Sequence, residues 1–536
     1  MPGKKRTPQR KATPRHKPAA KRPREDPKPG PAAPRPPEDE LLSMPQAIEM
    51  LKTTRATFYR WLRSGKIQGM KVGRQWRFYR DQIGRFLRGE EPRIALAASA
   101  TPLLEQLTER FRQVAGRDPG PDGLPEDPVE RANHLLLHIA LRMRATDVHI
   151  EPTAREDPNY EKEGETADAA RIRLRIDGVL HPVAQFDHRL LPAVVEHWKR
   201  LAGVDVHEKV RPQDGRILMR VGADDLPERS LDIRLCVVPA VMGEALTMRF
   251  LRRDEVKLDL DRIEYSPPDR ERILRSLHSP WGMLLVTGPT GTGKTTVLYS
   301  WMLHLNSPEV KIMSVEDPVE FLLPGIIQIG VRERAGVTFA SSIRSMLRSA
   351  PNVIMVGEIR DRETLQLCFQ SALTGHLVMT TLHAETAVAA LGRMVDMGCE
   401  PFLIADATRL VLSQRLVRKV CPECSVPEEP SQEQRERLHE LTGGLGGTRA
   451  ALPREYRKAV GCPACGKTGY RGQTVAAEVL EITPEIAKCV RSGASAPELQ
   501  AIAIGQGMTT MAADGIRRAA EGQTTIDEVL RVLARS

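Results

Sequence analysis

One segment constrains the fold of this chain more than any other: a short apolar run, Met283–Thr287, followed by Gly-Pro-Thr-Gly-Thr-Gly-Lys-Thr at residues 288–295. This spacing matches the pattern GxxxxGK[ST], and the apolar run before it and the helical pattern after it supply the context that the pattern requires. Glycines let backbone N–H groups surround a phosphate, and the N-terminus of the following helix adds its dipole. We therefore predict a phosphate-binding loop in an α/β sheet rather than a structural turn.

The residues of this loop have separate expected roles. The lysine, Lys294, should meet the β- and γ-phosphates of a nucleotide, and the next residue, Thr295, should ligate Mg²⁺. The residues assigned to nucleotide binding in the loop are Gly288, Pro289, Thr290, Gly291, Thr292, Gly293, Lys294, Thr295 and Thr296.

Two acidic clusters follow apolar runs that we expect to be strands of the same parallel sheet. Glu358 comes after Val353–Val356, and Glu316 and Asp317 come after Lys311–Val315. Open α/β sheets bind ligands at the carboxyl ends of their strands, where a carboxylate can orient Mg²⁺ or polarise the attacking water. Each cluster taken alone is equally consistent with an ordinary loop.

Two histidines, His376 and His383, flank a further apolar run, Leu377–Thr381. A single histidine at a strand end is more often structural than functional. Because Thr374-Gly-His376 comes one strand after Glu358, however, we predict that His376 is placed to sense the γ-phosphate. Both histidines are therefore candidate catalytic residues.

The eight cysteines include two Cys-x-x-Cys pairs, Cys421/Cys424 and Cys462/Cys465, which are separated by 37 residues. Four thiolates with no open position predict a closed, tetrahedral Zn²⁺ site that is structural rather than catalytic. A redox role, or no ligand at all, is the alternative. The remaining cysteines, expected in the core, are Cys236, Cys368, Cys399 and Cys489.

The positive charge is concentrated near the N-terminus. Residues 1–37 hold 12 Lys/Arg, two acids and 11 prolines, and residues 41–90 hold 11 Lys/Arg against three acids, whereas the whole chain carries only +10. The first 40 residues cannot bury enough apolar area to fold, so we expect a disordered tail. This tail is either simply solvated or available to contact nucleic acid or anionic lipid.

The segment after the tail has the pattern of a small folded domain. Ser43 can cap a helix with Gln46 three residues later, and a second helix is expected over Thr54–Ser64. Two short strands around a glycine turn are expected within Met70–Phe78, and a third helix near Asp81–Leu87.

The chain has no run of about 18 apolar residues, and its N-terminus has no apolar core of a secretory signal. We therefore expect no membrane-spanning helix and a cytoplasmic location.

The ordered motifs resemble one known family, the secretion and type IV pilus assembly ATPases (the GspE/PilB family). In that family, the segments Gly288–Thr296, Val315–Glu320, Gly357–Asp361 and Thr374–Val378 correspond to the Walker A, Asp-box, Walker B and His-box motifs, in this order. Upstream, the resemblance continues in Ala145–Pro152, Arg175–Val179 and Pro212–Arg216. Gly461–Gly472 is similar to the tetracysteine motif of its secretion and assembly members.

The resemblance implies a homohexamer that binds ATP between a PAS-like and a RecA-like domain. By motif match, Glu358 would activate water, and Glu316 and Asp317 would support the metal and the water. Candidate arginine fingers, which can raise rates by about 10³–10⁵, are Arg216, Arg234 and Arg249. Surface salt bridges are the alternative role for these arginines.

The small N-terminal domain resembles the excisionase/MerR-like winged helix-turn-helix family. The resemblance is carried by Thr53–Gly65 and Val72–Arg77. If the domain binds DNA, Arg55, Thr57 and Arg60 would face the major groove, and Arg74 and Arg77 on the wing would meet phosphates. Such modules also serve as protein adaptors, so both roles stay open.

The expected fold is therefore α/β, with a RecA-like P-loop core and several smaller parts. The expected segments are residues 1–40 (tail), 41–90 (winged helix-turn-helix), 91–128 (linker with one amphipathic helix near Leu103–Val114), 129–253 (PAS-like domain with a charged insertion near 154–169), 254–410 (RecA-like domain), 411–480 (zinc subdomain) and 481–536 (helical C-terminal region).

The function that these features favour is an ATP-hydrolysing motor of a type II secretion or type IV pilus assembly machine. It would associate peripherally with the cytoplasmic face of the inner membrane and act on a platform protein there. Two alternatives remain at this point: a DNA-uptake or DNA-transport motor, and a DNA-binding regulator whose ATPase is a switch.

Overall fold

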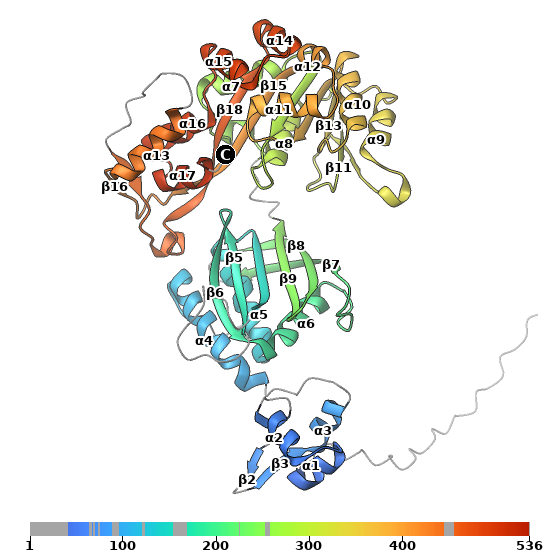
Figure 1. The fold of residues 1–536 in the computed structure, drawn as a ribbon, viewed down its shortest axis with the longest axis vertical. Helices are drawn as coiled ribbons and strands as arrows, with labels where there is room; N and C mark the ends of the chain where they lie inside the picture. Colours follow the sequence, from blue (N-terminus) through green and yellow to red (C-terminus); the bar gives the residue numbers. More distant parts are fainter. Residues whose placement is uncertain are drawn as a thin grey trace, which may run out of the picture. The chain divides into compact units, whose positions relative to one another are not determined.

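The computed structural model describes residues 41–63, 67, 70–72, 75–87, 96–120, 124–153, 169–223, 226–251, 258–443 and 455–534. The chain forms two compact units, Met1–Ile94 and Ala95–Ser536 (Figure 1). The basic tail and nearly all of the charged insertion lie outside the described residues.

The first unit contains three helices and a three-stranded antiparallel sheet. Its elements are β1 (Leu41–Ser43), α1 (Met44–Met50), α2 (Arg55–Arg63), β2 (Met70–Val72), β3 (Gln75–Tyr79) and α3 (Arg80–Leu87), with strand order β1-β3-β2. The expected capping box is present, since Ser43 N donates to Gln46 Oε1 at 2.8 Å. Phe58 and Phe78 meet edge to face in the core, 5.0 Å apart.

The second unit begins with a six-stranded antiparallel sheet in the order β6-β5-β4-β9-β8-β7. Its elements are α4 (Leu96–Ala115), α5 (Pro128–Arg142), β4 (Asp147–Thr153), β5 (Ala169–Ile176), β6 (Val179–Asp187), α6 (Leu191–Leu201), β7 (Gln213–Ala223), β8 (Leu226–Ala240) and β9 (Gly243–Leu251). Helix α4 begins seven residues earlier than the sequence suggested and contains Pro102. Ala100, in the added first part of this helix, is buried in the same apolar core as Leu103, Leu107 and the sheet, so packing extends the helix.

A seven-stranded sheet forms the centre of the second unit. Its strands are β10 (Gly282–Thr287), β11 (Ile312–Glu316), β12 (Ile327–Gly330), β13 (Val353–Val356), β14 (Leu377–Leu382), β15 (Thr408–Val420) and β18 (Tyr470–Glu481), in the order β12-β11-β13-β14-β10-β15-β18. All neighbouring pairs are parallel except β15 and β18. The expected parallel sheet therefore extends further along the chain than predicted and ends in one antiparallel edge strand.

Helices cover both faces of this sheet (Figure 1). One face packs against α7 (Pro267–Leu277) and α8 (Lys294–Leu305). The other packs against α9 (Phe339–Leu347), α10 (Arg362–Leu373), α11 (Ala387–Asp396), α12 (Pro401–Ala407), α14 (Pro484–Arg491) and α15 (Ala496–Gly505). The strands are buried on both sides, which explains their continuous apolar runs.

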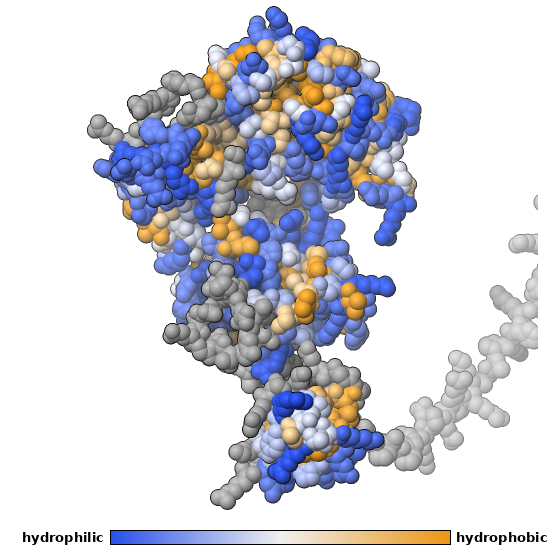
Figure 2. Space-filling view, in the orientation of Figure 1, coloured by the Kyte–Doolittle hydropathy of each residue, from blue (hydrophilic) through white to orange (hydrophobic). Residues whose placement is uncertain are grey.

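The remaining elements lie between and after the last two strands of the sheet. They are β16 (Val426–Glu428), α13 (Gln432–Gly443), β17 (Tyr456–Lys458), α16 (Met511–Ala520) and α17 (Ile526–Leu533). These helices share one apolar cluster with Val417 of β15 and Ala476 of β18. Hydrophilic side chains cover α13 (Figure 2). Among the described helices, none is long and apolar enough to cross a membrane.

Candidate active site and cysteine cluster

The glycine loop follows β10 at the carboxyl edge of the parallel sheet. Two of its glycines are required by the backbone: Gly288 has φ +143°, and Gly293, which caps α8, has φ +83°. A Cβ on Gly288 would lie 2.8 Å from both the carbonyl oxygen of Gln414 and the hydroxyl of Thr292. The loop is therefore closely packed and cannot accept a side chain at its first position.

Lys294 lies at the start of α8 and points back over the loop. Its ammonium group donates to the carbonyl oxygens of Gly288 and Pro289, each at 2.8 Å. Burial lowers the pKa of Lys294, while the negative charge of Glu358 acts in the opposite direction. The cation of the loop and the acid after β13, two strands away from β10 in the sheet, therefore lie close enough to interact.

Two residues that sequence reasoning missed support the loop from the other side. Gln414 of β15 is buried and donates through Nε2 to the carbonyl oxygen of Thr292 at 2.6 Å. The hydroxyl of Tyr265 donates to Gln414 Oε1 at 3.0 Å. The pairing of β10 with β15 brings Gln414 to the loop, and Tyr265 reaches it through Gln414, so no local pattern could have identified either residue.

Glu358 follows β13 and is accessible, with 26% of its side chain exposed. Arg360 Nε donates to Glu358 Oε1 at 2.7 Å, and Arg360 Nη1 lies 3.1 Å from Asp317 Oδ2. His383 Nε2 lies 3.5 Å from Glu358 Oε2. The structure thus places two predicted acids around Arg360 and a predicted histidine beside one of them. Sequence reasoning quoted Arg360 within its motif but gave it no role.

Glu316 occupies a different environment at the end of the neighbouring strand β11. It is 3% exposed, and its carboxylate accepts hydrogen bonds from Ser314 Oγ at 2.6 Å, Gln328 Nε2 at 3.0 Å and the hydroxyl of Tyr299. Burial, together with Glu316, raises the pKa of the Tyr299 hydroxyl, which therefore stays a donor. The motif match assigned the Glu316 carboxylate to metal and water, but in the structure its oxygens accept hydrogen bonds from protein groups.

His376 lies at the wrong edge of the sheet for the role predicted from its motif. Its carbonyl oxygen accepts from Gly282 N at 3.1 Å, and Gly282, the first residue of β10, is opposite Leu377. The phosphate loop follows the last residue of β10, so His376 is separated from it by the length of a strand, about 20 Å. Because the strands are parallel, only the histidine after β14, His383, reaches the carboxyl edge.

The three candidate arginine fingers form one row across the six-stranded sheet. Arg216 of β7 is opposite Arg234 of β8, which in turn is opposite Arg249 of β9. Residues directly opposite on neighbouring strands project from the same face. The register therefore groups three residues that lie far apart in the sequence.

Each arginine of this row has a carboxylate partner in the structure. Arg216 Nη2 lies 2.5 Å from Asp232 Oδ2, and Arg249 Nε lies 2.8 Å from Asp147 Oδ1. Arg234 instead pairs at 3.0 Å with Glu320, in the segment that follows β11 of the seven-stranded sheet. Of the three, Arg234 therefore forms its ion pair with the segment that carries Asp317.

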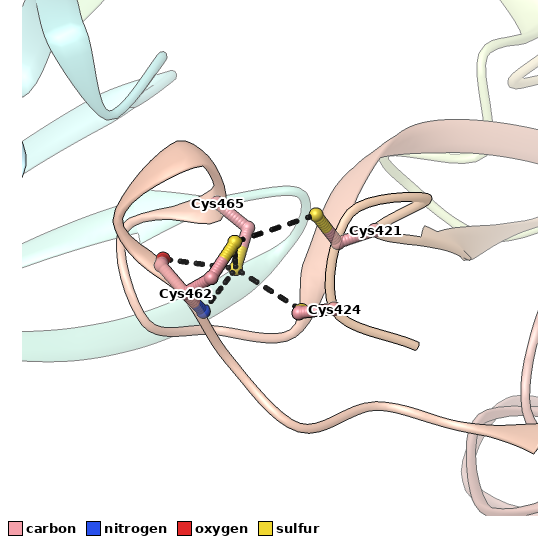
Figure 3. A group of neighbouring side chains, drawn as sticks. All are labelled: Cys421, Cys424, Cys462 and Cys465. Carbon is pink, nitrogen blue, oxygen red and sulfur yellow. Dashed lines mark hydrogen bonds between the residues drawn. The ribbon is translucent and has the colours of Figure 1, made fainter. Parts of the chain in front are cut away.

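The four paired cysteines form one cluster with their sulfur atoms facing each other (Figure 3). Cys421 and Cys424 follow β15, and Cys462 and Cys465 precede β18. All four sulfur atoms lie within 4.8 Å of one another. Four thiols at this separation fit the donor set and the tetrahedral geometry of a closed metal site.

Backbone N–H groups point at the sulfurs of this cluster. Gly461 N donates to Cys424 Sγ at 3.3 Å, and the N–H groups of Cys462 and Gly469 donate to Cys465 Sγ at 3.1 and 3.2 Å. Burial opposes ionisation of Cys465, but these backbone bonds lower its pKa to about 7, whereas burial raises the pKa of Cys421 to about 12. The N–H donors favour thiolates, which are the form that binds metal.

The residues predicted to touch DNA are only partly accessible in the first unit. Arg55 and Arg60 of α2 are exposed, whereas the Thr57 hydroxyl accepts a hydrogen bond from Thr54 Oγ1 at 3.0 Å. Arg77 donates to Gln75 Oε1 at 2.8 Å. Arg74 lies outside the described residues.

Together, the sheet order, the glycine loop and the acids at neighbouring strand ends place this molecule in the class of P-loop ATPases with a RecA-like core. Such a core holds the phosphates on backbone amides and directs acids from adjacent strands towards them.

Comparison with known sequences identifies the family. The model of the type II/IV secretion system protein family matches residues 124–531, and the chain belongs to this family. A helix-turn-helix domain model matches residues 41–91. The family assignment and the N-terminal helix-turn-helix domain predicted from the motifs are thereby confirmed.

Individual relatives differ in how much of their length this chain covers. The type II secretion system protein HxcR of Pseudomonas aeruginosa is 40% identical over 444 residues, which are 83% of this chain and 85% of HxcR. The type IV pilus assembly ATPase PilB of Thermus thermophilus is 38% identical over 450 residues, which are 82% of this chain. The chain spans about half (48%) of that relative's length.

Among solved structures, the ATPase DotB of Yersinia pseudotuberculosis aligns with 76% of this chain and 94% of its own, with a TM-score of 0.53 and 19% identity. The likeness at this identity concerns the fold, and it agrees with the α/β architecture described above.

Proposed function

We propose that this chain is the ATP-hydrolysing motor of a type II secretion or type IV pilus assembly machine. The observation that carries the proposal is the proximity of Lys294 in the glycine loop to the accessible acid Glu358. Its relatives include a type IV pilus assembly ATPase and a type II secretion system protein. By the family resemblance, it would act as a homohexamer at the cytoplasmic face of the inner membrane, bound peripherally to a platform protein.

In this proposal, each residue of the site has one task. The amides of the loop and Lys294 bind the β- and γ-phosphates of ATP, and Glu358 polarises the attacking water. Arg360 holds Glu358 and Asp317 in place, and His383 lies beside the same carboxylate. Mg²⁺, which we assign to Thr295, supplies charge neutralisation at the phosphates.

The buried acid Glu316 has a positioning role in this scheme. Its hydrogen bonds to Tyr299, Ser314 and Gln328 fix the end of β11, from which Asp317 follows directly. We therefore assign the water-activating role to Glu358 rather than to Glu316. Arg234 is our leading arginine finger, since it already contacts the segment after Asp317 through Glu320.

We also assign Zn²⁺ to Cys421, Cys424, Cys462 and Cys465. The ion would tie the end of β15 to the start of β18 and would take no part in hydrolysis, because four cysteines leave no open position.

The function is tested by measuring ATP hydrolysis and oligomer mass on the same preparation. Hydrolysis should rise with hexamer formation in the presence of ATP and Mg²⁺, and Lys294→Ala should lose nucleotide binding. A protein that binds no nucleotide, or that hydrolyses ATP fully as a monomer, would contradict the motor proposal.

A second candidate function, DNA binding by the first unit, rests on the exposed Arg55 and Arg60 of α2. Duplex DNA should bind the full chain with an affinity that falls steeply as salt rises, and Arg55→Ala should weaken it. If no binding occurs at low salt, the domain is a protein adaptor. If DNA stimulates hydrolysis, a DNA-transport motor is favoured, and promoter-specific binding favours a regulator.

A further inference from the structure

A cavity of about 550 Å³ lies beside the first cysteine pair, away from the phosphate loop. It is lined by the end of β15, by residues next to Cys421 and Cys424, by β17 and β18, and by the turn after α16. This volume is within the range of small-molecule sites, about 300–1,000 Å³. The cavity is therefore large enough for a ligand of nucleotide or diphosphate size.

The cavity is lined by four cations and by no carboxylate. The cations are Arg144, Lys419, Arg457 and Arg471, and the polar side chains of Ser425 and Gln523 complete the wall. A concave wall with a single sign of charge concentrates the field and attracts counter-ions. The lining thus selects anions.

Most of these cations are not closely neutralised from outside the cavity. The nearest carboxylate to Arg471 is Glu423 at 3.7 Å, and Arg144 lies 3.8 Å from Asp177, so both contacts are longer than a hydrogen bond. Arg457 donates to the carbonyl oxygen of Ser425 at 3.4 Å, and no ion pair involves it within the described part of the chain. Three guanidinium groups therefore keep donors for a ligand.

We propose that this cavity binds a compact phosphate-bearing anion. Guanidinium groups present paired N–H donors that match phosphate oxygens, and bonds of this kind are roughly twice as strong as neutral ones. The same chemistry is offered by a soluble diphosphate and by the headgroup of an anionic lipid.

The fourth cation connects the cavity to the nucleotide site. Lys419 Nζ pairs with Glu264 Oε1 at 2.7 Å, and the next residue, Tyr265, bonds to Gln414, which holds the carbonyl oxygen of Thr292 in the phosphate loop. An anion in the cavity competes with Glu264 for Lys419. Its binding therefore alters nucleotide affinity, and this part of the inference rests on the proposed ATPase, whereas anion binding does not.

Binding is tested with inorganic pyrophosphate by calorimetry without Mg²⁺, using the full chain carrying Lys294→Ala so that the phosphate loop contributes little. Adding Arg457→Gln should weaken binding by about tenfold or more. The matched control is Lys458→Gln, which removes the same charge from the next residue of β17, a residue that is paired with Glu428 and does not line the cavity. Equal affinity of the two variants would overturn the proposal.

A second variant distinguishes a loss of anion binding from a loss of folding. Arg471→Gln should weaken pyrophosphate binding as Arg457→Gln does, with unchanged thermal unfolding. In the chain that carries Lys294→Ala, binding to vesicles of phosphatidylglycerol and of phosphatidylcholine identifies the source of the anion. Binding of phosphatidylglycerol alone, lost in Arg457→Gln, assigns a lipid headgroup, whereas binding of pyrophosphate assigns a soluble ligand. If neither probe binds in a manner that depends on Arg457, the site does not exist.

Coupling between the cavity and the nucleotide site is measured separately, in the chain with an intact phosphate loop. The measured quantity is the nucleotide affinity with and without whichever anion binds the cavity. Arg457→Gln should remove the effect and leave basal hydrolysis unchanged. If the anion binds but nucleotide affinity stays constant, the connection through Lys419 is wrong. If hydrolysis is absent altogether while the anion binds, the proposed function fails and the anion site stands.

Discussion

The phosphate site and the cysteine cluster are built at the same edge of one sheet, yet their chemistry is opposite. The first gathers unlike groups, a cation, a second acid and a histidine, around the accessible carboxylate of Glu358. The second gathers four identical donors, of which Cys421 is fully buried. The comparison teaches that a site for turnover stays open to its substrate, whereas a site for stability closes on its ligand.

Glu358→Gln should give the largest effect and should act on turnover alone. The amide keeps the shape of the side chain but cannot polarise water, so hydrolysis should fall by about 10²–10⁴-fold while ATP still binds. Single-turnover hydrolysis and nucleotide titration on the same protein check this. A rate near that of the wild type would transfer the role to Glu316.

Cys421→Ser should act on stability and only indirectly on turnover. Loss of one of four thiolates should reduce the metal content from about one ion per chain to nearly none, because structural Zn²⁺ sites depend on the complete set. Elemental analysis and the thermal unfolding of the C-terminal region are the measurements. If a fresh wild-type preparation contains no metal, the cysteine cluster is not a metal site and its comparison with the phosphate site fails.

Glu316→Gln should have a smaller effect than Glu358→Gln, although both acids end neighbouring strands. The amide oxygen can replace Oε1 and accept from Ser314 and Gln328, while the amide NH₂ can donate to the Tyr299 hydroxyl in place of Oε2. Hydrolysis should therefore stay above about a tenth of the wild-type rate. The ratio of the two variants' rates, measured side by side, is the readout. An equal loss would mean that the buried carboxylate takes part in chemistry.

Removal of residues 1–94 should have the smallest effect. All candidate catalytic residues and all four clustered cysteines lie in the second compact unit, Ala95–Ser536. Basal hydrolysis should therefore stay within about twofold of the full chain, a change of less than 0.5 kcal/mol. A large loss would show that the first unit supports the site.

The parts of the site that could be predicted from sequence are those whose signal is local. The glycine loop and the Cys-x-x-Cys pairs each fit within a short stretch, because φ > 0 at Gly288 and Gly293 and the spacing of two thiols are set by neighbouring residues. The first unit was predictable for the same reason, since Ser43 and Gln46 form the expected cap.

The parts that could not be predicted depend on strand register and packing. His376 and His383 flank the same strand, and only the direction of that strand relative to β10 decides which of them reaches the loop. Likewise, Glu316 and Glu358 both end apolar strands, but the neighbours Tyr299 and Gln328 bury only the first. Sequence patterns give only the spacing of residues along the chain, so they contain information on neither strand direction nor side-chain packing.

The length of β15 gives the molecule a mechanical property. The strand is paired with β10 up to Ser413, opposite Thr287, and then continues beside β18 to Val420, just before Cys421. This two-stranded ribbon extends about 23 Å beyond the point where β10 enters the glycine loop, so a tilt of about 5° at its base would move its tip by about 2 Å. A rotation at the base of this ribbon would therefore displace the cysteine cluster further than it displaces the glycine loop.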